Sequence, residues 1–378
     1  MAKFAMFMSV LSYHQEGLCN AFYRRLGDDF VLVLFSKELP GYRSETKFAN
    51  KNNQYPYIVR AYEHANTAEF VQQIVDRVDV GIVGSAPSYI LDLFIAQKKT
   101  VFLYSERFFK KGTWRCFIPM TRRKVLDRCR NSEYFKVLAA SAFLPYDLHL
   151  MKNKAQCLKW GYFPDLSSLV KSERAVREKK TVSILWVARF LDWKHPESML
   201  CLAEYLRKKG IDSHICMVGG GDAKLKAQMI DMVNRKKLHD YIDIASEPLP
   251  PQEIQQLMLQ ADIFVATSDY GEGWGVIINE SMAAGCAVVA SSAMGAARML
   301  IQHEENGYLY RWNDMKALCA TVERLCKDNA LRERIGNAAK RSIQDEYNAD
   351  MAAERLIGYL QGERFETGIC STCDIVKK

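Results

Sequence analysis

Residues 267–290 read TSDYGEGWGVIINESMAAGCAVVA, and the four residues before them, IFVA, are apolar. This order predicts a buried strand, a glycine-rich loop, a helix from about Val276, and a second strand over Ala287–Ala290. Glycines without a Cβ let a ligand approach the loop backbone closely, and the first turn of the helix offers free N–H groups to an anion. The segment therefore predicts a phosphate-binding turn inside a βαβ unit.

The same alternation of short apolar runs and longer helix-periodic stretches extends through most of the 378 residues. It predicts an α/β protein with two Rossmann-like domains, whose parallel sheets face an interdomain crevice. The predicted strands are 4–10, 30–34, 80–83, 100–103 and 136–139 in the first half, and 182–187, 213–218, 242–244, 263–266 and 287–290 in the second.

A charged stretch without Gly or Pro, Leu169–Lys180, is the expected linker between the two domains. It places the boundary near residue 175. We therefore expect an N-terminal domain over 1–175 and a C-terminal domain over 176–345. A C-terminal helix and tail over 346–378 follow, and that helix can pack back on the N-terminal domain.

The composition is that of an ordinary globular protein, with 49% hydrophobic and 25% charged residues, which excludes disordered and fibrous classes. The formal charge of +8 is unevenly distributed. Residues 1–180 hold 29 Lys and Arg against 17 Asp and Glu, whereas the remainder holds 23 against 27. Within 98–136 there are 12 basic and 3 acidic residues. An anionic partner is therefore expected in the N-terminal half.

Eleven cysteines are scattered singly, apart from one Cys370-x-x-Cys373 pair near the C-terminus. An odd number of cysteines inside apolar runs indicates reduced thiols in a cytoplasmic protein. The tail pair lacks a second pair of Cys or His residues to complete a zinc site, so no metal is expected there and its role stays open. No apolar run approaches the roughly 20 residues that span a bilayer, so no transmembrane helix is expected.

Two further turns carry residues suited to a nucleotide. Residues 185–196 read LWVARFLDWKHP, a strand followed by a loop with the cations Arg189 and Lys194. Residues 215–222 read ICMVGGGD, a strand followed by three glycines. In the 267–290 segment, Glu272 lies in the loop and Glu280 in the helix, where carboxylates accept hydrogen bonds from sugar hydroxyls. Taken singly, each of these residues also fits a role without a ligand, as an exposed charge or as a glycine that a turn requires.

Together, Glu272-x7-Glu280, Arg189-x4-Lys194 and the glycine turn resemble the signature of retaining glycosyltransferases of the group-1 type, also called family 4, which have the GT-B fold. The resemblance covers residues 181–345. It implies that Arg189 and Lys194 neutralise the diphosphate of a UDP- or GDP-sugar, that Glu280 binds the ribose, and that Glu272 binds the donor sugar. No Asp-x-Asp cluster is present, so no metal is expected. The other implied donor contacts are Gly219, Gly220, Gly221, Gly273, Trp274, Gly275 and Val276.

The sequence departs from the family pattern in three places. Ala287 stands where a Pro is common, and Gly295-Ala-Ala-Arg-Met299 lacks the Glu of the family's Gly-Gly-x-x-Glu turn. Neither change touches the two glutamates of the signature. The base-binding loop, Ile244–Leu249, lacks its usual Gly, so the choice between uridine and guanosine stays open. The donor sugar, the acceptor, the linkage and the oligomeric state also stay open.

The N-terminal half resembles the family only loosely, as an acceptor-binding domain is expected to. His14 follows the first strand, in the place of the family's Gly-rich acceptor loop, and is either a contact to donor or acceptor or simply polar surface. Glu106 follows the strand over 100–103, where the family often has a His near the reacting sugar. Glu106 is a candidate to accept the acceptor hydroxyl's proton or to bind a hydroxyl. The alternative is a salt bridge to a neighbouring cation.

Cations and aromatic residues interleave after Glu106, which suits a surface that binds anionic lipid headgroups. Nucleic acid would fit the charge, but no recognition helix or RNA-binding motif accompanies it. Basic residues continue through 122–130. The candidate acceptor or membrane contacts are Arg107, Phe108, Phe109, Lys110, Lys111, Trp114 and Arg115.

We therefore expect a metal-independent, retaining hexosyltransferase that moves a sugar from a nucleotide-diphosphate donor to a hydroxyl of a lipid-linked or polysaccharide acceptor. Such an activity serves cell-surface polysaccharide biosynthesis, and we expect the protein at the inner face of the cytoplasmic membrane. Two alternatives stay open: a GT-B sugar-nucleotide epimerase, which needs no acceptor, and a non-catalytic sugar-nucleotide- or lipid-binding adaptor. The candidate catalytic residues are Glu272, Arg189, Lys194, Glu106 and His14.

Overall fold

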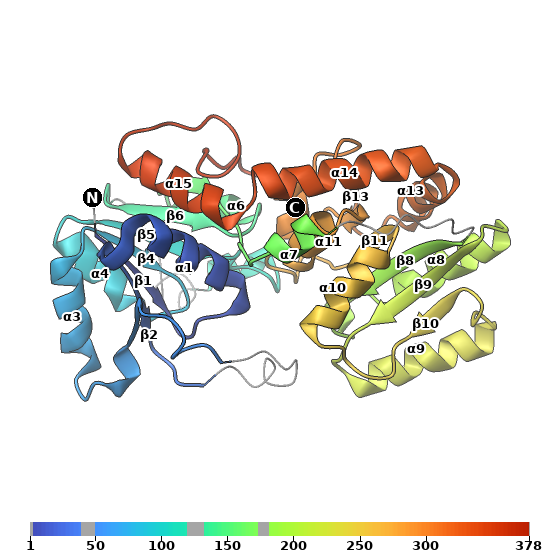
Figure 1. The fold of residues 1–378 in the computed structure, drawn as a ribbon, viewed down its shortest axis with the longest axis horizontal. Helices are drawn as coiled ribbons and strands as arrows, with labels where there is room; N and C mark the ends of the chain where they lie inside the picture. The colour runs from blue at the N-terminus through green and yellow to red at the C-terminus, as the bar shows by residue number, and fades with distance from the viewer. Residues whose placement is uncertain (1–2, 39–49, 119–131, 173–180, 378) are drawn as a thin grey trace. The chain divides into compact units, whose positions relative to one another are not determined.

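The computed structural model describes residues 3–38, 50–118, 132–172 and 181–377. It divides into two compact units (Figure 1). Unit 1 comprises Met1–Asp165 and Tyr347–Lys378, and unit 2 comprises Leu166–Glu346. The chain thus passes into unit 2 earlier than the expected boundary near residue 175. The start of the expected linker is part of helix α7 (Ser167–Lys171), and residues 173–180 lie outside the described residues.

Unit 1 is built on a seven-stranded sheet in the order β3-β2-β1-β4-β5-β6-β7, with every pair parallel. Its central strands are buried along their whole length, because helices cover both faces of such a sheet. The strands are β1 (Phe4–Met8), β2 (Phe30–Leu34), β3 (Ile58–Arg60), β4 (Val80–Val83), β5 (Thr100–Ser105), β6 (Phe135–Ala139) and β7 (Gln156–Lys159). The helices are α1 (Tyr13–Leu26), α3 (Thr67–Arg77), α4 (Tyr89–Ala96), α6 (Leu144–Leu150) and α15 (Ala349–Leu360), with short 3-10 turns that include η3 (Thr113–Phe117).

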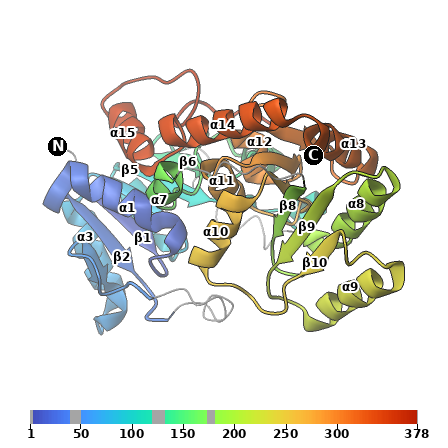
Figure 2. The same ribbon diagram turned by 45° about the vertical axis from the view of Figure 1, so that its right-hand side comes forward.

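The C-terminal segment belongs to unit 1. Helix α15 packs on α1, as Figures 1 and 2 show. Arg24 and Arg25 of α1 form ion pairs with Asp350 of α15 at 2.7 and 2.8 Å. The tail then runs antiparallel to β7, where the Cys373 N–H donates to the Cys157 carbonyl oxygen at 2.9 Å. The tail therefore extends the sheet beyond its last strand.

Unit 2 has a six-stranded parallel sheet in the order β10-β9-β8-β11-β12-β13. Strands β11 and β12 are buried at every position. The strands are β8 (Val182–Val187), β9 (Ser213–Val218), β10 (Ile242–Ile244), β11 (Ile263–Ala266), β12 (Ala287–Ser291) and β13 (Tyr308–Tyr310). Besides α7, the helices are α8 (Glu197–Lys208), α9 (Ala223–Lys236), α10 (Pro251–Gln260), α11 (Ile277–Ala283), α12 (Gly295–Leu300), α13 (Met315–Lys327) and α14 (Asn329–Asp345), and η4 (Asp192–Lys194) is a 3-10 turn.

The two parallel Rossmann-like sheets confirm the fold class expected from the sequence. Each of the predicted strands is present, with ends shifted by no more than about two residues, within the usual uncertainty of such boundaries. The strands that the sequence reading missed, β3, β7 and β13, lie at sheet edges and have three or four residues each. Short edge strands carry little hydrophobic patterning, which explains why they escaped prediction.

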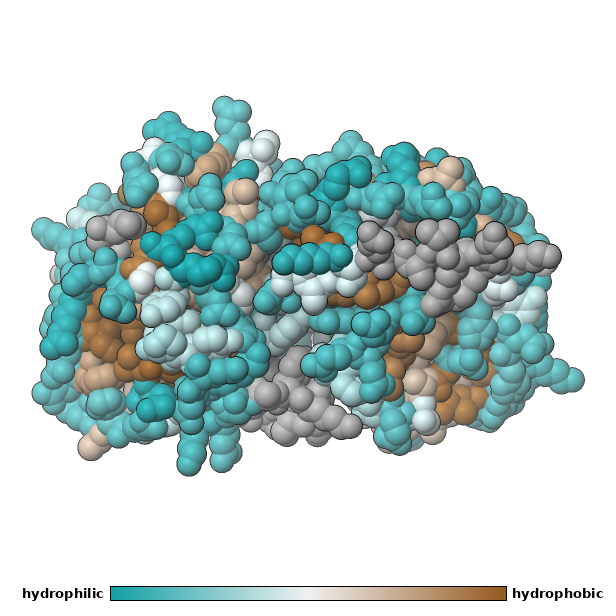
Figure 3. Space-filling model, in the orientation of Figure 1, coloured by the Kyte–Doolittle hydropathy of each residue, from teal (hydrophilic) through white to brown (hydrophobic). Residues whose placement is uncertain are grey.

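The described residues include no helix with the length and apolarity that crossing a bilayer requires. Figure 3 shows one face of the protein, on which hydrophilic side chains predominate and hydrophobic ones show in the areas between them.

Candidate active site

The loops that follow β8 and β9 lie against each other at the carboxyl edge of the unit 2 sheet. The Phe190 N–H donates to the Gly220 carbonyl oxygen at 2.7 Å. A Cβ on Gly219 would lie 1.8 Å from the Ala188 carbonyl oxygen, so a side chain does not fit there. Gly221 adopts a φ of 117°, a conformation that favours glycine. The packing of the two loops therefore already requires glycines in the predicted turn. A contact to a ligand would be a second role of the same residues.

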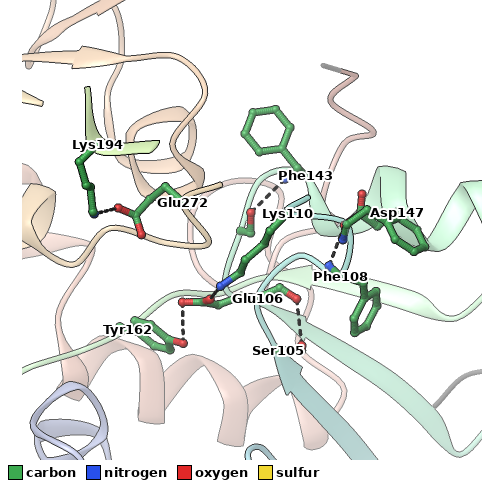
Figure 4. A network of polar contacts seen from close by, with 11 residues as sticks. Ser105, Glu106, Phe108, Lys110, Phe143, Asp147, Tyr162, Lys194 and Glu272 are labelled. Atoms are coloured by element: carbon green, nitrogen blue, oxygen red, sulfur yellow. Dashed lines mark hydrogen bonds and ion pairs between the residues drawn. The ribbon is translucent and has the colours of Figure 1, made fainter. Parts of the chain in front are cut away.

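Lys194 and Glu272 come from loops that follow different strands and meet in unit 2. The Lys194 Nζ contacts the Glu272 Oε2 (Figure 4). Both side chains are largely buried, with 13% and 11% of their surface exposed. The Lys194 Nζ also lies 4.3 Å from the centre of the Trp193 ring. Because a buried charge is costly without a partner, each of the two stabilises the other in this place.

Hydroxyl and backbone contacts hold these two loops together. The Thr267 hydroxyl accepts a hydrogen bond from the Trp186 indole at 2.8 Å and donates to the Lys194 carbonyl oxygen at 2.5 Å. The Asp269 N–H donates to the Trp193 carbonyl oxygen at 3.0 Å. The main chain is thus fixed beside both members of the Lys194–Glu272 pair, so the site is largely formed before a ligand binds.

His195 forms a second link between the same loops, which the sequence reading did not assign. Its Nε2 lies 3.2 Å from an Asp269 carboxylate oxygen and its Nδ1 lies 2.8 Å from a Glu197 carboxylate oxygen. The hydrogen bonds to Asp269 and Glu197 raise the pKa of His195 from 6.5 to about 9. The imidazole is therefore charged at neutral pH and adds a second cation beside Lys194.

The helix expected from about Val276 is α11, which begins at Ile277 and has seven residues, about two turns. Val276 is its N-terminal cap, and Glu280 lies half-buried within it. Gly275 adopts a φ of 89°, and a Cβ there would lie 2.6 Å from the Met294 Cε and 3.3 Å from the Glu272 Cγ. This glycine therefore leaves space beside Glu272.

Trp274, predicted to contact the donor, is a core residue and this prediction is wrong for its side chain. Only 1% of it is exposed, and its indole N–H donates to the Asn279 side-chain oxygen at 2.9 Å. The adjacent Gly273 is buried as well. The Trp274 indole fills the core beneath the loop and supports it, but is not exposed to a ligand.

Arg189 differs from Lys194 in its surroundings. It lies two residues beyond β8 and is exposed, whereas Lys194 is enclosed. Lys194 contacts Glu272. The Arg-x4-Lys pattern therefore places one cation inside the site and one at the protein surface.

In unit 1, a tyrosine that the sequence reading missed joins the two predicted residues Glu106 and His14. The Tyr162 hydroxyl donates to the Glu106 Oε1 at 2.9 Å (Figure 4). The His14 ring stacks on the Tyr162 ring, with centroids 5.3 Å apart. Glu106 also contacts the Lys110 Nζ through its other oxygen, Oε2, so the expected alternative, a salt bridge to a nearby cation, is present in the structure.

Two of the predicted acceptor or membrane contacts, Arg107 and Phe109, lie inside unit 1, so neither belongs to a membrane-facing surface. Arg107 is 2% exposed and pairs with Asp147 at 2.9 Å, and Phe109 is fully buried. The Asp147 carboxylate also accepts the Phe108 and Phe109 N–H groups at 2.7 and 3.0 Å. Burial raises the pKa of Asp147, and Arg107 opposes that rise. These contacts hold the chain after β5 against α6.

The exposed part of the basic segment lies further along, in and before η3. Trp114 is 61% exposed and Phe117, which was not singled out from the sequence, is 79% exposed. Lys111 is exposed, and the Arg115 guanidinium lies 5.8 Å from the centre of the Trp114 ring. We call these four residues the Trp114 surface. The basic residues at 122–130 lie outside the described residues.

Within the part of the chain that the structure describes, no three His, Cys, Asp or Glu side chains are grouped so that they could hold a metal ion. Cys370 and Cys373 are buried free thiols that pack beside β7. The expected independence from metal stays a prediction.

Comparison with known proteins finds a family model that matches most of unit 2. Residues 170–342 match the family described as glycosyl transferases group 1. Among curated proteins, the amylovoran biosynthesis glycosyltransferase AmsK of Erwinia amylovora is 30% identical over 183 residues, which cover 47% of this chain and 44% of AmsK. The N,N'-diacetylbacillosaminyl-diphospho-undecaprenol alpha-1,3-N-acetylgalactosaminyltransferase of Campylobacter jejuni is 29% identical over 48% of this chain and 44% of that protein. The chain thus spans less than half the length of these relatives.

Solved structures resemble nearly the whole chain. Anabaena HepE in complex with UDP has a TM-score of 0.70 at 15% identity and covers 96% of this chain and 100% of HepE. TarM has a TM-score of 0.65 at 11% identity and covers 95% of this chain and 98% of TarM. These similarities show that the chain has the GT-B fold, as the sequence led us to expect.

Proposed function

We propose that this chain, whose residues 170–342 match the glycosyl transferases group 1 family, moves a sugar from a nucleotide diphosphate to a hydroxyl group of an acceptor. Unit 2 binds the nucleotide-sugar donor and unit 1 binds the acceptor. HepE, a structural neighbour, was crystallised with UDP and with UDP-glucose, which supports a nucleotide sugar as the donor.

The observation that carries this proposal is the enclosed Lys194–Glu272 pair. A diphosphate leaving group gains negative charge as its bond to the sugar breaks, and a cation already held in place lowers the energy of that state. Glu272 keeps Lys194 paired until the donor arrives. The phosphates then take its place beside the lysine, and the carboxylate accepts hydrogen bonds from the donor sugar's hydroxyls.

Other residues of unit 2 complete the donor site in this proposal. Arg189, exposed at the end of β8, reaches the phosphates with a guanidinium that can form two parallel hydrogen bonds. Glu280 accepts the ribose hydroxyls, and the backbone at Gly220 and Gly275 lines the nucleotide. The base is uracil or guanine. Retention at the anomeric carbon follows from the family resemblance, and independence from metal follows from the lack of an Asp-x-Asp cluster in the sequence.

The acceptor in this proposal is lipid-linked or a growing polysaccharide at the cytoplasmic membrane. The names of AmsK and of the Campylobacter enzyme place those two proteins in polysaccharide or glycan synthesis. In unit 1, Glu106 and His14 border the acceptor, with Glu106 oriented by Tyr162 and Lys110.

Turnover assays with Glu272→Ala and Lys194→Ala test the proposal. UDP- and GDP-sugars are supplied with and without extracts of lipid-linked glycans, and nucleotide release is measured. We expect strong loss in both variants and wild-type rates in the matched controls Glu253→Ala and Lys208→Ala, which change exposed residues on α10 and α8. Wild-type rates in all four variants would rule the site out. NMR of the product's anomeric proton tests retention, and rates with EDTA test metal independence.

The same assay separates the alternative activities. An epimerase converts the donor sugar without an acceptor, and an adaptor binds the nucleotide without turnover. We expect donor turnover that rises when the acceptor is added. Full conversion of the sugar nucleotide to its epimer, with no acceptor present, would contradict a transferase.

Peripheral membrane binding through the Trp114 surface completes the proposal. Exposed aromatic rings beside cations suit the boundary between lipid headgroups and acyl chains. Flotation with vesicles containing anionic lipid should recover the wild type, and added salt should weaken binding. We expect loss of flotation for the double variant Trp114→Ala/Phe117→Ala, but not for Ile375→Ala, which removes an exposed apolar residue elsewhere in unit 1. Equal flotation of all three proteins would contradict the membrane role.

A further inference from the structure

Helix α9 of unit 2 has a lysine where its packing pattern calls for an apolar residue. The buried residues of α9 are Met229 and Val233, which belong to the core around the unit 2 sheet. Lys226 lies three residues before Met229 and therefore on the same face of the helix. A charged group on the face that packs against the sheet requires polar partners there.

The Lys226 ammonium contacts the loops that follow three neighbouring strands, β10, β9 and β8. Its Nζ donates to the Ser246 carbonyl oxygen, after β10, at 2.7 Å and to the Gly219 carbonyl oxygen, after β9, at 3.3 Å. The same atom lies 5.6 Å from the centre of the Phe190 ring, after β8, within the range of cation–π contacts. One side chain therefore joins three loops at the carboxyl edge of the sheet.

The loop after β10 is attached to its neighbour differently from the loop after β9. The Asp222 N–H donates to the Phe190 carbonyl oxygen at 2.9 Å, so backbone hydrogen bonds join the loops after β8 and β9. The contacts between the loop after β10 and the glycine turn include the Lys226 hydrogen bonds and the packing of Pro248 beside Gly220, where a Cβ would lie 3.4 Å from the Pro248 Cγ. Removal of the ammonium should therefore loosen the loop after β10 relative to the glycine turn.

The place of Lys226 has a cost in free energy, which argues against a role in packing alone. Burial lowers the pKa of Lys226, because it disfavours the charged form, and Glu247 in the loop after β10 opposes this effect. An apolar side chain of similar length would fill the same face of α9 without this cost. The lysine adds charged hydrogen bonds to two backbone carbonyls, and these fix the geometry of the loops.

The order of the strands brings one part of the donor to these loops. In the proposed function, the donor sugar lies at Glu272, after β11, and the diphosphate lies at Lys194, after β8. The strands follow one another in the order β11-β8-β9-β10. A nucleotide sugar that extends along this edge of the sheet brings its base, the group farthest from the sugar, to the loops after β9 and β10.

We propose that Lys226 is a positioning residue for the nucleotide base: it sets the spacing of the loops after β9 and β10, which bind the base. This role rests on the proposed function, which identifies the ligand as a nucleotide sugar. Lys226 itself does not contact the diphosphate and takes no part in breaking the bond to the sugar.

Calorimetric titration of the full chain with UDP, GDP and inorganic pyrophosphate tests this role. Lys226→Met keeps the length of the side chain and removes its donors, so the affinity for whichever of UDP and GDP the wild type prefers should fall about tenfold. The affinity for pyrophosphate, which has no base, should stay unchanged. Lys226→Arg keeps a charged donor and should restore most of the nucleotide affinity. The matched control Lys224→Met changes an exposed residue of the same helix and should bind as the wild type does.

Two results of the titration would overturn the role. Equal nucleotide affinity of the wild type and Lys226→Met would show that the loops bind the base without the lysine. An equal loss of affinity for pyrophosphate would show that Lys226 acts through its charge on the phosphates and not on the base.

Hydrogen–deuterium exchange tests the same role without a ligand. The backbone N–H groups over 244–249 should exchange faster in Lys226→Met than in the wild type, whereas those of the buried strand β11 should be unchanged. Unchanged exchange over 244–249 would show that Lys226 does not fix this loop. Faster exchange throughout unit 2 would assign Lys226 a general role in stability. Either result would overturn the inference.

Initial rates separate positioning of the base from the chemical step. Loss of base positioning weakens donor binding in the ground state and in the transition state alike, so Lys226→Met should raise KM and change kcat no more than about twofold. A fall in kcat at unchanged KM would place Lys226 in the chemical step and contradict a positioning role.

The wild type distinguishes failure of this inference from failure of the proposed function. A wild type that binds neither UDP nor GDP defeats both. A wild type that turns over a nucleotide sugar, beside a Lys226→Met variant with the same affinity and the same KM, defeats the inference alone.

Discussion

Unit 2 and unit 1 both join a lysine to a glutamate beyond the carboxyl ends of a parallel sheet, but they do so differently. In unit 2, Lys194 and Glu272 are 78 residues apart and both largely buried. In unit 1, Glu106 and Lys110 are four residues apart, and their side chains are 23% and 40% exposed. The long-range pair depends on the folding of two loops together, whereas the local pair forms within one segment.

This difference shows where charge is available for a ligand. The Lys194 ammonium is enclosed, so its interaction with a phosphate would be little weakened by water. The Lys110 ammonium is open to solvent and already paired, so it adds little attraction. Unit 1 carries the chain's basic excess, yet part of it lies inside the fold, as the buried Arg107–Asp147 pair shows. The net charge of a region therefore does not give the number of cations that are available to a ligand.

The largest expected effect concerns the fully buried Arg107–Asp147 pair of unit 1, in which neither side chain is exposed. Asp147→Ala leaves a buried guanidinium without its partner, so the free energy of unfolding should fall by about 3–5 kcal/mol. Urea unfolding followed by tryptophan fluorescence measures this. Glu106→Ala, which breaks the half-exposed pair, serves as the control, with a loss below about 1 kcal/mol. Equal losses would contradict the distinction between the two pairs.

The next effect compares the two lysines in catalysis. Lys194→Ala should lower kcat/KM for the nucleotide sugar about 100-fold or more, because a held charge on the leaving group is lost. Lys110→Ala should change it no more than about threefold, since that cation is exposed and paired. Initial rates at several donor concentrations separate kcat from KM. A larger loss of kcat/KM in Lys110→Ala than in Lys194→Ala would contradict the distinction between the enclosed and the exposed lysine.

The smallest effect is a pH dependence of unit 2. Because the pKa of His195 is raised from 6.5 to about 9, its contribution to stability is fully present below pH 6.5 and is lost as pH rises through about 9. The wild type should thus lose Tm between pH 6.5 and 9 relative to His195→Gln. Thermal unfolding of both proteins at matched ionic strength checks this. Parallel Tm curves would show that His195 does not link the two loops.

How much could be predicted from sequence also differs between the units. In unit 2, the spacing of Glu272, Glu280, Arg189 and Lys194 was enough to predict the loops and the sheet around them. In a sheet built from βαβ units, the loops that follow the parallel strands lie at the same edge of the sheet. The spacing could not show that Lys194 is enclosed while Arg189 is exposed. That depends on how the loops after β8 and β11 pack, through contacts such as Thr267 to the Lys194 carbonyl.

In unit 1, most strands and the place of Glu106 after β5 could be predicted, but the surroundings of its neighbours Arg107 and Phe109 could not. Counting charges along 98–136 treats every cation as exposed, and Arg107 has a carboxylate partner forty residues away in α6. Tyr162, which orients Glu106, follows β7, a strand too short and polar to stand out. Pairings across such distances follow from the tertiary fold and leave no local pattern.

The central claim, that unit 2 binds a nucleotide diphosphate through Lys194, is tested most directly by ligand-induced thermal shift. UDP, GDP and ADP are titrated against the wild type, Lys194→Ala and Lys208→Ala, and a nucleotide that binds only the folded state raises Tm. We expect UDP or GDP to raise the Tm of the wild type and of Lys208→Ala, with the shift largely lost in Lys194→Ala. No shift with any nucleotide, or an undiminished shift in Lys194→Ala, would contradict the claim.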